Sequence, residues 1–302
     1  MDVSRWFKSG LDCQLLIGLS AAQTTVLLFK DEQCLEQIVI PERLASACFD
    51  ALHALLNQHN LKHPAVTLVL ADDCYQHAEL DKPSVPDEEV AAALQWSVKE
   101  LISIEPDNMQ LDYYDVASTG SRQQVRVIAA ERQWLSDWGH MVVSQLRGEL
   151  HKVLIEELCL LNLFDEADVP TMLLWQKQGG EVQLLLVHKQ HLYLSRSLRG
   201  SANLESMASE LLPSIIDSLS LEVQRALDYF ESNLRQPPVK IVKLALPEAV
   251  RQLVQMQMQA NLAVDVEPLE TQAISGFSSP DDIAVLPILA ARVEPAEVAA
   301  EA

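Results

Sequence analysis

The amino-acid sequence predicts an α/β protein built from two related halves. The chain has 302 residues, of which 49% are hydrophobic, and this is enough for two buried cores at about 150 residues per domain. A run of short apolar strands followed by helix and strand occurs twice along the chain. No short sequence repeat of fixed period is visible, so we expect the duplication in the architecture and not in the residues.

The first half opens with three apolar strands and continues into alternating helices and strands. In order, the predicted elements are strands at 15–19, 24–29 and 34–40, a helix at 44–56, strands at 66–70 and 124–129, and a helix at 131–146. We place this half at residues 1–165.

The second half repeats the order of strands, helix and strand. Its predicted elements are strands at 172–174, 182–187 and 192–198, a long helical region at 204–234, a strand at 241–246 and a helix at 248–258. We place this half at residues 166–275. The C-terminal segment at 276–302 is rich in Pro, Ala, Glu and Asp, and we expect disorder over about its last ten residues.

An additional helix and strand lie within the first half. Pro86 stands where a first helical residue belongs, and carboxylates in the next turn favour the positive end of the helix dipole. Apolar residues then recur at helical spacing, at Val90, Ala93, Leu94, Val98 and Leu101. Pro106 closes the helix, and an alternating stretch from Met109 predicts a strand. We assign an inserted subdomain to about residues 65–118.

Residues 79–116 resemble the PilM family of type IV pilus assembly proteins, and within it the MshI branch that serves the mannose-sensitive haemagglutinin (MSHA) pilus. The matching positions are Pro86, Glu88, Glu89, Val90, Trp96, Lys99, Leu101, Asp112 and Tyr113. Residues 219–230, which read LSLEVQRALDYF, are similar to a second helix of that family. The resemblance implies an actin-like fold of the FtsA and PilM type.

The resemblance also implies a function. In the PilM family, a groove beside the inserted subdomain accepts the short cytoplasmic tail of a PilN-type single-span inner-membrane protein. We therefore expect a cytoplasmic adaptor of the pilus assembly platform, with a PilN-like protein and other platform proteins as partners. Self-association and the docking face stay open.

Composition limits the partners and the compartment. With 43 acidic and 22 basic residues, the formal net charge of −21 opposes binding to nucleic acid or to an anionic membrane surface, and favours a basic partner. The sequence has no signal-peptide pattern and no run of about 18 apolar residues. We expect a cytoplasmic protein that lies at the inner membrane only through its partner. Five scattered cysteines predict neither a disulfide framework nor a metal site.

The nucleotide-binding positions of the family are altered in this chain. Where relatives read Gly-Ile-Asp-Ile-Gly-Ser-Ser, residues 16–22 put Gly18 at the acidic position and Ser20 at the glycine. Trp175 begins the stretch that replaces a second Asp-x-Gly. Because the carboxylate that organises magnesium is missing, we expect no cofactor and no catalytic residue, with ATP and Mg²⁺ disfavoured. No other catalytic motif is present.

The carboxylates and the aromatic residue of the inserted helix are the candidate partner-binding residues. Basic groups of a partner tail would meet Asp87, Glu88, Glu89 and Glu100, with Trp96 beside them. The alternative is that these charges only solvate the helix.

Two further functions remain open at this point. An active actin-like ATPase would need the divergent loops still to hold nucleotide. The cytoplasmic part of a type II secretion platform protein is similarly actin-like and poor in nucleotide motifs, but such a protein normally continues into a membrane span. We therefore expect the pilus adaptor.

Overall fold

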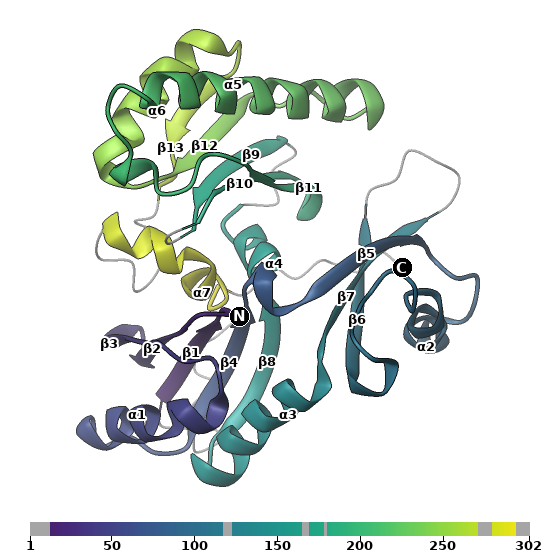
Figure 1. Cartoon of the computed structure of the whole chain (residues 1–302), viewed down its shortest axis with the longest axis vertical. Coiled ribbons are helices and arrows are strands. Elements are labelled where there is room, and N and C mark those ends of the chain that lie inside the picture. The colour runs from purple at the N-terminus through teal and green to yellow at the C-terminus, as the bar shows by residue number, and fades with distance from the viewer. Residues whose placement is uncertain (1–12, 117–122, 165–168, 178–179, 271–279, 294–302) are drawn as a thin grey trace. The chain divides into compact units, whose positions relative to one another are not determined.

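The computed structural model describes residues 13–116, 123–164, 169–177, 180–270 and 280–293 (Figure 1). The chain divides into two compact units, and each is described by itself. The first unit comprises Met1–Asp115, Arg122–Cys159 and Pro287–Arg292, and the second comprises Val116–Ser121, Leu160–Leu286 and Val293–Ala302. The expected disorder at the end of the chain concerns residues outside the described ranges.

A five-stranded sheet forms the body of the first unit. Its strands are β1 (Cys13–Leu19), β2 (Thr24–Lys30), β3 (Gln33–Ile40), β4 (Pro64–Leu70) and β8 (Glu149–Ile155). The spatial order is β3-β2-β1-β4-β8. The first three strands form an antiparallel meander, and β4 and β8 extend it with parallel pairs. All seven residues of β4 are buried, as expected for a parallel strand covered on both faces.

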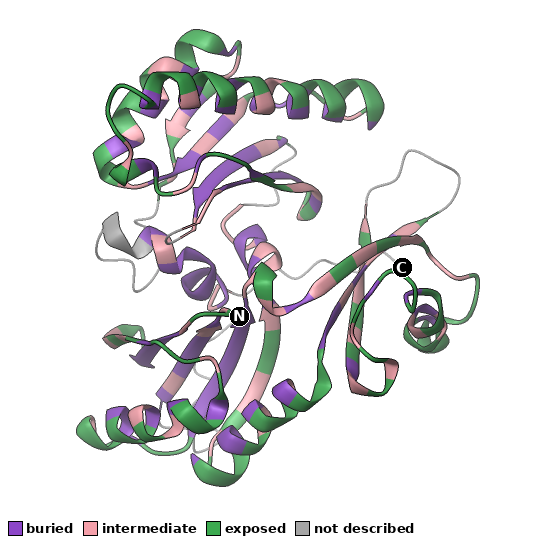
Figure 2. Cartoon of the chain, in the orientation of Figure 1, coloured by how far each residue is buried: buried purple, intermediate pink, exposed green. Residues whose placement is uncertain are grey.

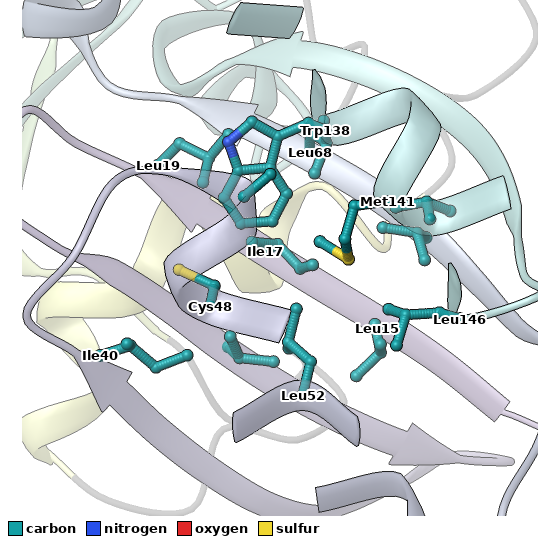
Figure 3. Packing of buried hydrophobic residues seen from close by; sticks show 14 of the residues in the cluster. Leu15, Ile17, Leu19, Ile40, Cys48, Leu52, Leu68, Trp138, Met141 and Leu146 are labelled. Atoms are coloured by element: carbon teal, nitrogen blue, oxygen red, sulfur yellow. The ribbon is translucent and has the colours of Figure 1, made fainter. Parts of the chain in front are cut away.

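Helices cover both faces of this sheet. Because side chains alternate along β1, Leu15, Ile17 and Leu19 point into a core shared with α1 (Ala45–Gln58) and α3 (Arg132–His140). Figure 3 shows these residues against Leu52 of α1 and Trp138 of α3. The opposite face carries residues of α7 (Leu286–Ala290). The helix α3 ends in a turn of π-helix, η4 (Met141–Gln145), and not as one helix reaching residue 146.

The first unit also holds a three-stranded sheet in the order β5-β7-β6. Its elements are β5 (Gln76–Asp81), α2 (Asp87–Ser97), the 3₁₀ turn η3 (Pro106–Asn108), β6 (Met109–Val116) and β7 (Gln124–Glu131). The helix α2 begins after Pro86 with three acidic residues in its first turn, as predicted. It ends at Ser97 and not near Pro106, so the predicted apolar position Leu101 lies beyond the helix and is exposed. Its apolar side buries Val90 and Leu94 against β7, while its outer side is exposed (Figure 2).

The second unit repeats the plan of the first. Its strands are β9 (Thr171–Gln176), β10 (Val182–His188), β11 (His191–Leu198), β12 (Ile241–Ala245) and β13 (Asp265–Pro268). Their order is β11-β10-β9-β12-β13, again an antiparallel meander followed by two parallel strands. The helices α5 (Leu212–Asp228) and α6 (Glu248–Asn261) pack on the core of this sheet. The predicted duplication of an α/β plan is therefore present.

Several elements differ from the sequence prediction. The region 204–234 is not one helix, because α5 starts next to Pro213 after a separate 3₁₀ turn, η5 (Leu204–Ser206), and ends in a π-helical turn, η6 (Tyr229–Asn233). Several elements have no counterpart among the predicted ranges. They are the strands β5, β8 and β13, the helices α4 (Glu156–Leu161) and α7, and the 3₁₀ helices η2 (Asp72–Cys74), η3 and η7 (Pro280–Val285).

Candidate functional site

The first unit contains a groove of about 900 Å³. Two strands line it, β6 from the three-stranded sheet and β8 from the five-stranded sheet, together with residues of α3 and η4. Both strands are the outermost of their sheets. An edge strand presents backbone N–H and C=O groups that can pair with an added chain. The groove is therefore bordered by two potential sites of main-chain hydrogen bonding.

Alternation in the three-stranded sheet puts α2 and the groove on opposite faces. The side chains of Leu111 and Tyr113 of β6 pack against the core beneath α2, whereas Tyr114 packs against the core of the five-stranded sheet. Residues 110–114 all line the groove, because β6 borders it along its length. On β7, Val127 belongs to the α2 core and Ile128 faces the groove. Because neighbouring residues of a strand point to opposite sides, each face of this sheet has a separate role.

Hydrogen bonds fix the start of β6 to the start of α3. The Nη2 group of Arg132 donates to the carbonyl oxygen of Met109 at 2.8 Å. The backbone N–H of Gln133 donates to Oδ1 of Asn108 at 2.9 Å, so it has a partner although it lies at a helix N-terminus. The groove is thus held in shape at this end by the protein itself.

An ion-pair network fixes the other end of the groove wall. Arg126 donates from Nη2 to Oε1 of Glu79 at 2.5 Å and from Nη1 to the hydroxyl of Tyr114 at 3.3 Å, and Nη1 lies 3.6 Å from Oε2 of Glu157. Burial raises the pKa of Tyr114 to about 12, although the Arg126 cation acts in the opposite direction. The phenol is therefore neutral at physiological pH and accepts the hydrogen bond from Arg126.

The groove is suited to apolar contacts with a ligand. Val143 of η4 and Val153 of β8 line it and are 56% and 43% exposed. Exposed valines between two strand edges suit an extended peptide with aliphatic side chains, since the backbone and the side chains can both be bound. Among the described residues, no group of three or more His, Cys, Asp or Glu side chains is arranged to hold a metal ion.

The predicted partner-binding residues lie on a different surface. The exposed set comprises Asp87, Glu88, Glu89, Trp96 and Glu100. None of them lines the groove. Four of them lie on the outer side of α2, and Glu100 lies in the turn after it. The structure therefore separates the groove from the acidic helix face that the sequence singled out.

The first altered nucleotide position, Gly18, is covered by the chain's own C-terminal segment. A Cβ atom on Gly18 would lie 2.3 Å from Cδ1 and 2.9 Å from Cγ1 of Ile288 in α7. Arg292, just beyond this helix, donates from Nε to Oε1 of Gln14 at 3.0 Å, and its guanidinium lies 4.3 Å from the ring centroid of Phe29. A side chain at position 18 would therefore require Ile288 of α7 to move.

The turn after Gly18 is closed by its own hydrogen bonds. The backbone N–H of Ser20 donates to the carbonyl of Gln23 at 3.0 Å, and the Ser20 hydroxyl donates to the same oxygen at 3.0 Å. The backbone N–H of Gln23 in turn donates to the Ser20 hydroxyl at 3.1 Å. Two N–H groups that a phosphate-binding turn would direct at a ligand are therefore used within the turn.

The second altered position, Trp175, also contacts the C-terminal segment. The Nε1 group of this buried indole donates to the carbonyl oxygen of Ile283 at 2.8 Å. The next residue, Gln176, donates from Nε2 to the carbonyl oxygens of Gly180 and Ser201, both at 3.1 Å. These side chains bind the protein's own backbone.

One wall of the groove, β8, was not predicted from the sequence. In that strand the pairing with β4 shifts between Val66 and Thr67, so His151 is an extra residue that interrupts the alternation. The apolar run Val153–Ile155 was the available signal. It is too short to distinguish a strand from a helix by periodicity.

No protein-family model matches the chain, and no curated protein sequence matches it. Solved structures do match. A structure described as the PilM-PilN type IV pilus biogenesis complex is similar with a TM-score of 0.62 and 17% identity over 93% of this chain and 99% of that chain. A Bacteroides thetaiotaomicron protein with an actin-like ATPase fold and unknown function has a TM-score of 0.51 and 10% identity over 93% and 97% of the two chains.

The cytoplasmic domain of EpsL, an inner-membrane component of the type II secretion system of Vibrio cholerae, has a TM-score of 0.49 and 13% identity over 92% and 94% of the two chains. The likenesses to the PilM-PilN complex and to the Bacteroides thetaiotaomicron protein establish the fold, and the predicted actin-like fold is confirmed. In the ranges that the structure describes, no helix has the length and apolar character needed to cross a bilayer.

Proposed function

We propose that the protein is an adaptor of a type IV pilus assembly platform, similar to PilM, and that its groove binds an extended cytoplasmic segment of a PilN-like inner-membrane protein. One observation carries the proposal: an apolar groove lies between two strand edges in a chain whose fold is similar to the PilM-PilN complex over 93% of its length.

The sequence resemblance supports a more specific assignment. The residues that follow Pro86 resemble the MshI branch, so we propose the MSHA-type pilus as the system that the protein serves. In this role the protein lies on the cytoplasmic side of the inner membrane and is held there by its partner. The net charge of −21 supports indirect association, because an anionic membrane surface repels the protein.

The dimensions and chemistry of the groove fit a short peptide. Its volume lies within the range of roughly 300–1,000 Å³ that is usual for ligand pockets. A strand added to β6 or β8 would gain main-chain hydrogen bonds, and aliphatic side chains would cover Val143 and Val153. Each buried CH₂ group contributes about 0.8 kcal/mol. Because hydrogen bonds hold both ends of the β6 wall, little energy is spent on forming the groove.

We further propose that the adaptor carries out no ATP hydrolysis. The support comes from the altered positions themselves, since Gly18 is covered by Ile288, the Ser20 turn is closed on itself, and Trp175 binds the backbone at Ile283.

A calorimetric titration with two ligands tests this function. The first ligand is a synthetic peptide of the cytoplasmic N-terminal segment of the PilN-like protein from the same pilus system, and the second is Mg-ATP. We expect the peptide to bind and Mg-ATP not to bind. Clear Mg-ATP binding would support the rival ATPase, and a peptide that does not bind would contradict the proposed partner.

Substitutions in the groove locate the binding site. Val143→Asp and Val153→Asp place a charge where an aliphatic side chain should rest, and each is expected to weaken peptide binding at least about tenfold. Val169→Asp is the matched control, because Val169 lies in the second unit and is 43% exposed, as is Val153. If the peptide binds both groove variants and the control equally well, then it does not bind in the groove.

A further inference from the structure

The outer face of α2 carries a second feature that the groove does not use. Trp96 is 72% exposed, whereas Trp134, Trp138 and Trp175 are buried. The Nζ atom of Lys99 lies 3.6 Å from the centroid of the Trp96 ring. One face of the indole is therefore already occupied by a cation from the turn that follows the helix.

Acidic residues predominate along the chain on both sides of Trp96. Residues 82–107 hold six acidic side chains against two lysines. One of these lysines, Lys82, is paired with Asp87 at 3.6 Å and Asp115 at 3.4 Å. On helical spacing, Glu89 lies seven residues before Trp96 on the same side of α2, and Glu100 lies in the turn that follows the helix, next to Lys99. The ring thus lies between two acidic positions.

A small residue, Ala92, precedes Trp96 on the helix and leaves the ring accessible from that side. Ala92 is one turn before Trp96 on the same side and is exposed. Its methyl group is too small to cover an indole. A group approaching along the helix can therefore reach both the ring face and the carboxylates.

We propose that this face of α2 is a docking site for an arginine-bearing basic segment of a protein partner, separate from the groove. Arginine fits better than lysine, because a planar guanidinium can stack on the indole and still direct N–H groups at carboxylates. Charge complementarity selects the occupant, since the surface is acidic and its aromatic ring already holds a cation. Lys99 is then an internal competitor that the partner's arginine displaces.

This site and the groove lie on opposite faces of the three-stranded sheet. The alternation of β6 assigns Leu111 and Tyr113 to the α2 side and Tyr114 to the core on the other side. Failure of one proposal therefore leaves the other intact, and a variant of one surface serves as a control for the other.

The test compares two labelled peptides that differ only in their basic residue. Fluorescence anisotropy measures the binding of the full chain to an alternating arginine–serine peptide and to the corresponding lysine–serine peptide. We expect the arginine peptide to bind more tightly, by at most about 2- to 5-fold, which is the full range of an exposed cation–π contact. The Trp96→Ala variant should bind both peptides equally. The proposal is overturned if the wild-type protein binds the two peptides equally well. It is also overturned if the Trp96→Ala variant still prefers the arginine peptide.

Three further variants sharpen the comparison. Lys99→Ala removes the competitor and should raise the preference for arginine over lysine. Glu89→Gln combined with Glu100→Gln should weaken the binding of both peptides and should make their affinities less dependent on salt concentration. Met256→Ala, at an apolar residue of the second unit that is 66% exposed, should change nothing. If Met256→Ala lowers the preference as much as Trp96→Ala does, the site is not at α2.

The same variant tests a different occupant. Sedimentation of the free protein shows whether it self-associates through this face. If the wild-type protein is a dimer that Trp96→Ala converts to a monomer, the occupant is a second copy of the chain, and the proposed basic partner is wrong.

Discussion

Replacing Gly18 with aspartate restores the acidic residue of the family pattern and tests whether α7 excludes it. The new Cβ would lie 2.3 Å from Cδ1 of Ile288, far inside the normal contact distance, so the buried isoleucine must move. Removing such a side chain from its site costs about 1.5–3 kcal/mol. A carboxylate without a partner at this position adds about 1–3 kcal/mol. We expect Gly18→Asp to lower the free energy of unfolding by about 2.5–6 kcal/mol in total.

Urea denaturation followed by circular dichroism measures this loss. Gly18→Ala separates packing from charge, because it introduces the same Cβ without the carboxylate. In a strand with free space, this change would stabilise the protein by about 0.4–1 kcal/mol through the unfolded chain. Here we expect destabilisation instead. In the double variant with Ile288→Ala, the cost should be smaller than the sum of the two single changes. A Gly18→Ala protein as stable as the wild type would refute the argument that α7 packs against this glycine.

Three other predictions concern contacts of the described residues. Trp175→Phe leaves the carbonyl of Ile283 without its indole donor and should cost about 1–3 kcal/mol in urea denaturation; an unchanged midpoint would contradict this. Arg292→Ala removes the hydrogen bond to Gln14 and the ion pair with Glu32, and it should lower the free energy of unfolding by about 2 kcal/mol in the same urea assay. The folded-state pKa of Tyr114, about 12, lies above its unfolded value near 10, so its contribution to stability is present below about pH 10 and is lost between about pH 10 and 12. Tyr114→Phe should reduce this alkaline loss in a pH series of unfolding measurements, and an equal loss in both proteins would contradict it.

The body of each unit was predictable because its strands are nearly continuous apolar runs. Residues 24–29 and 182–187 have no close helical alternative at that length, and both are strands in the structure. The start of α2 was equally clear, since Pro86 and the acidic first turn are local signals. Elements of this kind can be predicted because residues close together along the chain determine them.

The groove was not predictable because its walls come from distant parts of the chain. Its two strands, β6 and β8, are separated by β7 and α3, and β8 carries a bulge at His151 that masks its pattern. Nor does the residue composition of the C-terminal segment reveal that residues 287–292 pack on β1. That contact depends on the absence of a side chain at Gly18, which has meaning only when both segments are placed together.

The three-stranded sheet explains how one small subdomain can present two recognition surfaces. Its β6 strand alternates between Leu111 and Tyr113, which support α2, and Tyr114, which is held by Arg126 at the end of the groove. A substitution that reverses this alternation would damage both surfaces, whereas Trp96→Ala and Val143→Asp should each affect only one. Measuring both peptides on both variants therefore decides between two independent sites and a single continuous one. Independent losses are the result that the alternation of β6 requires.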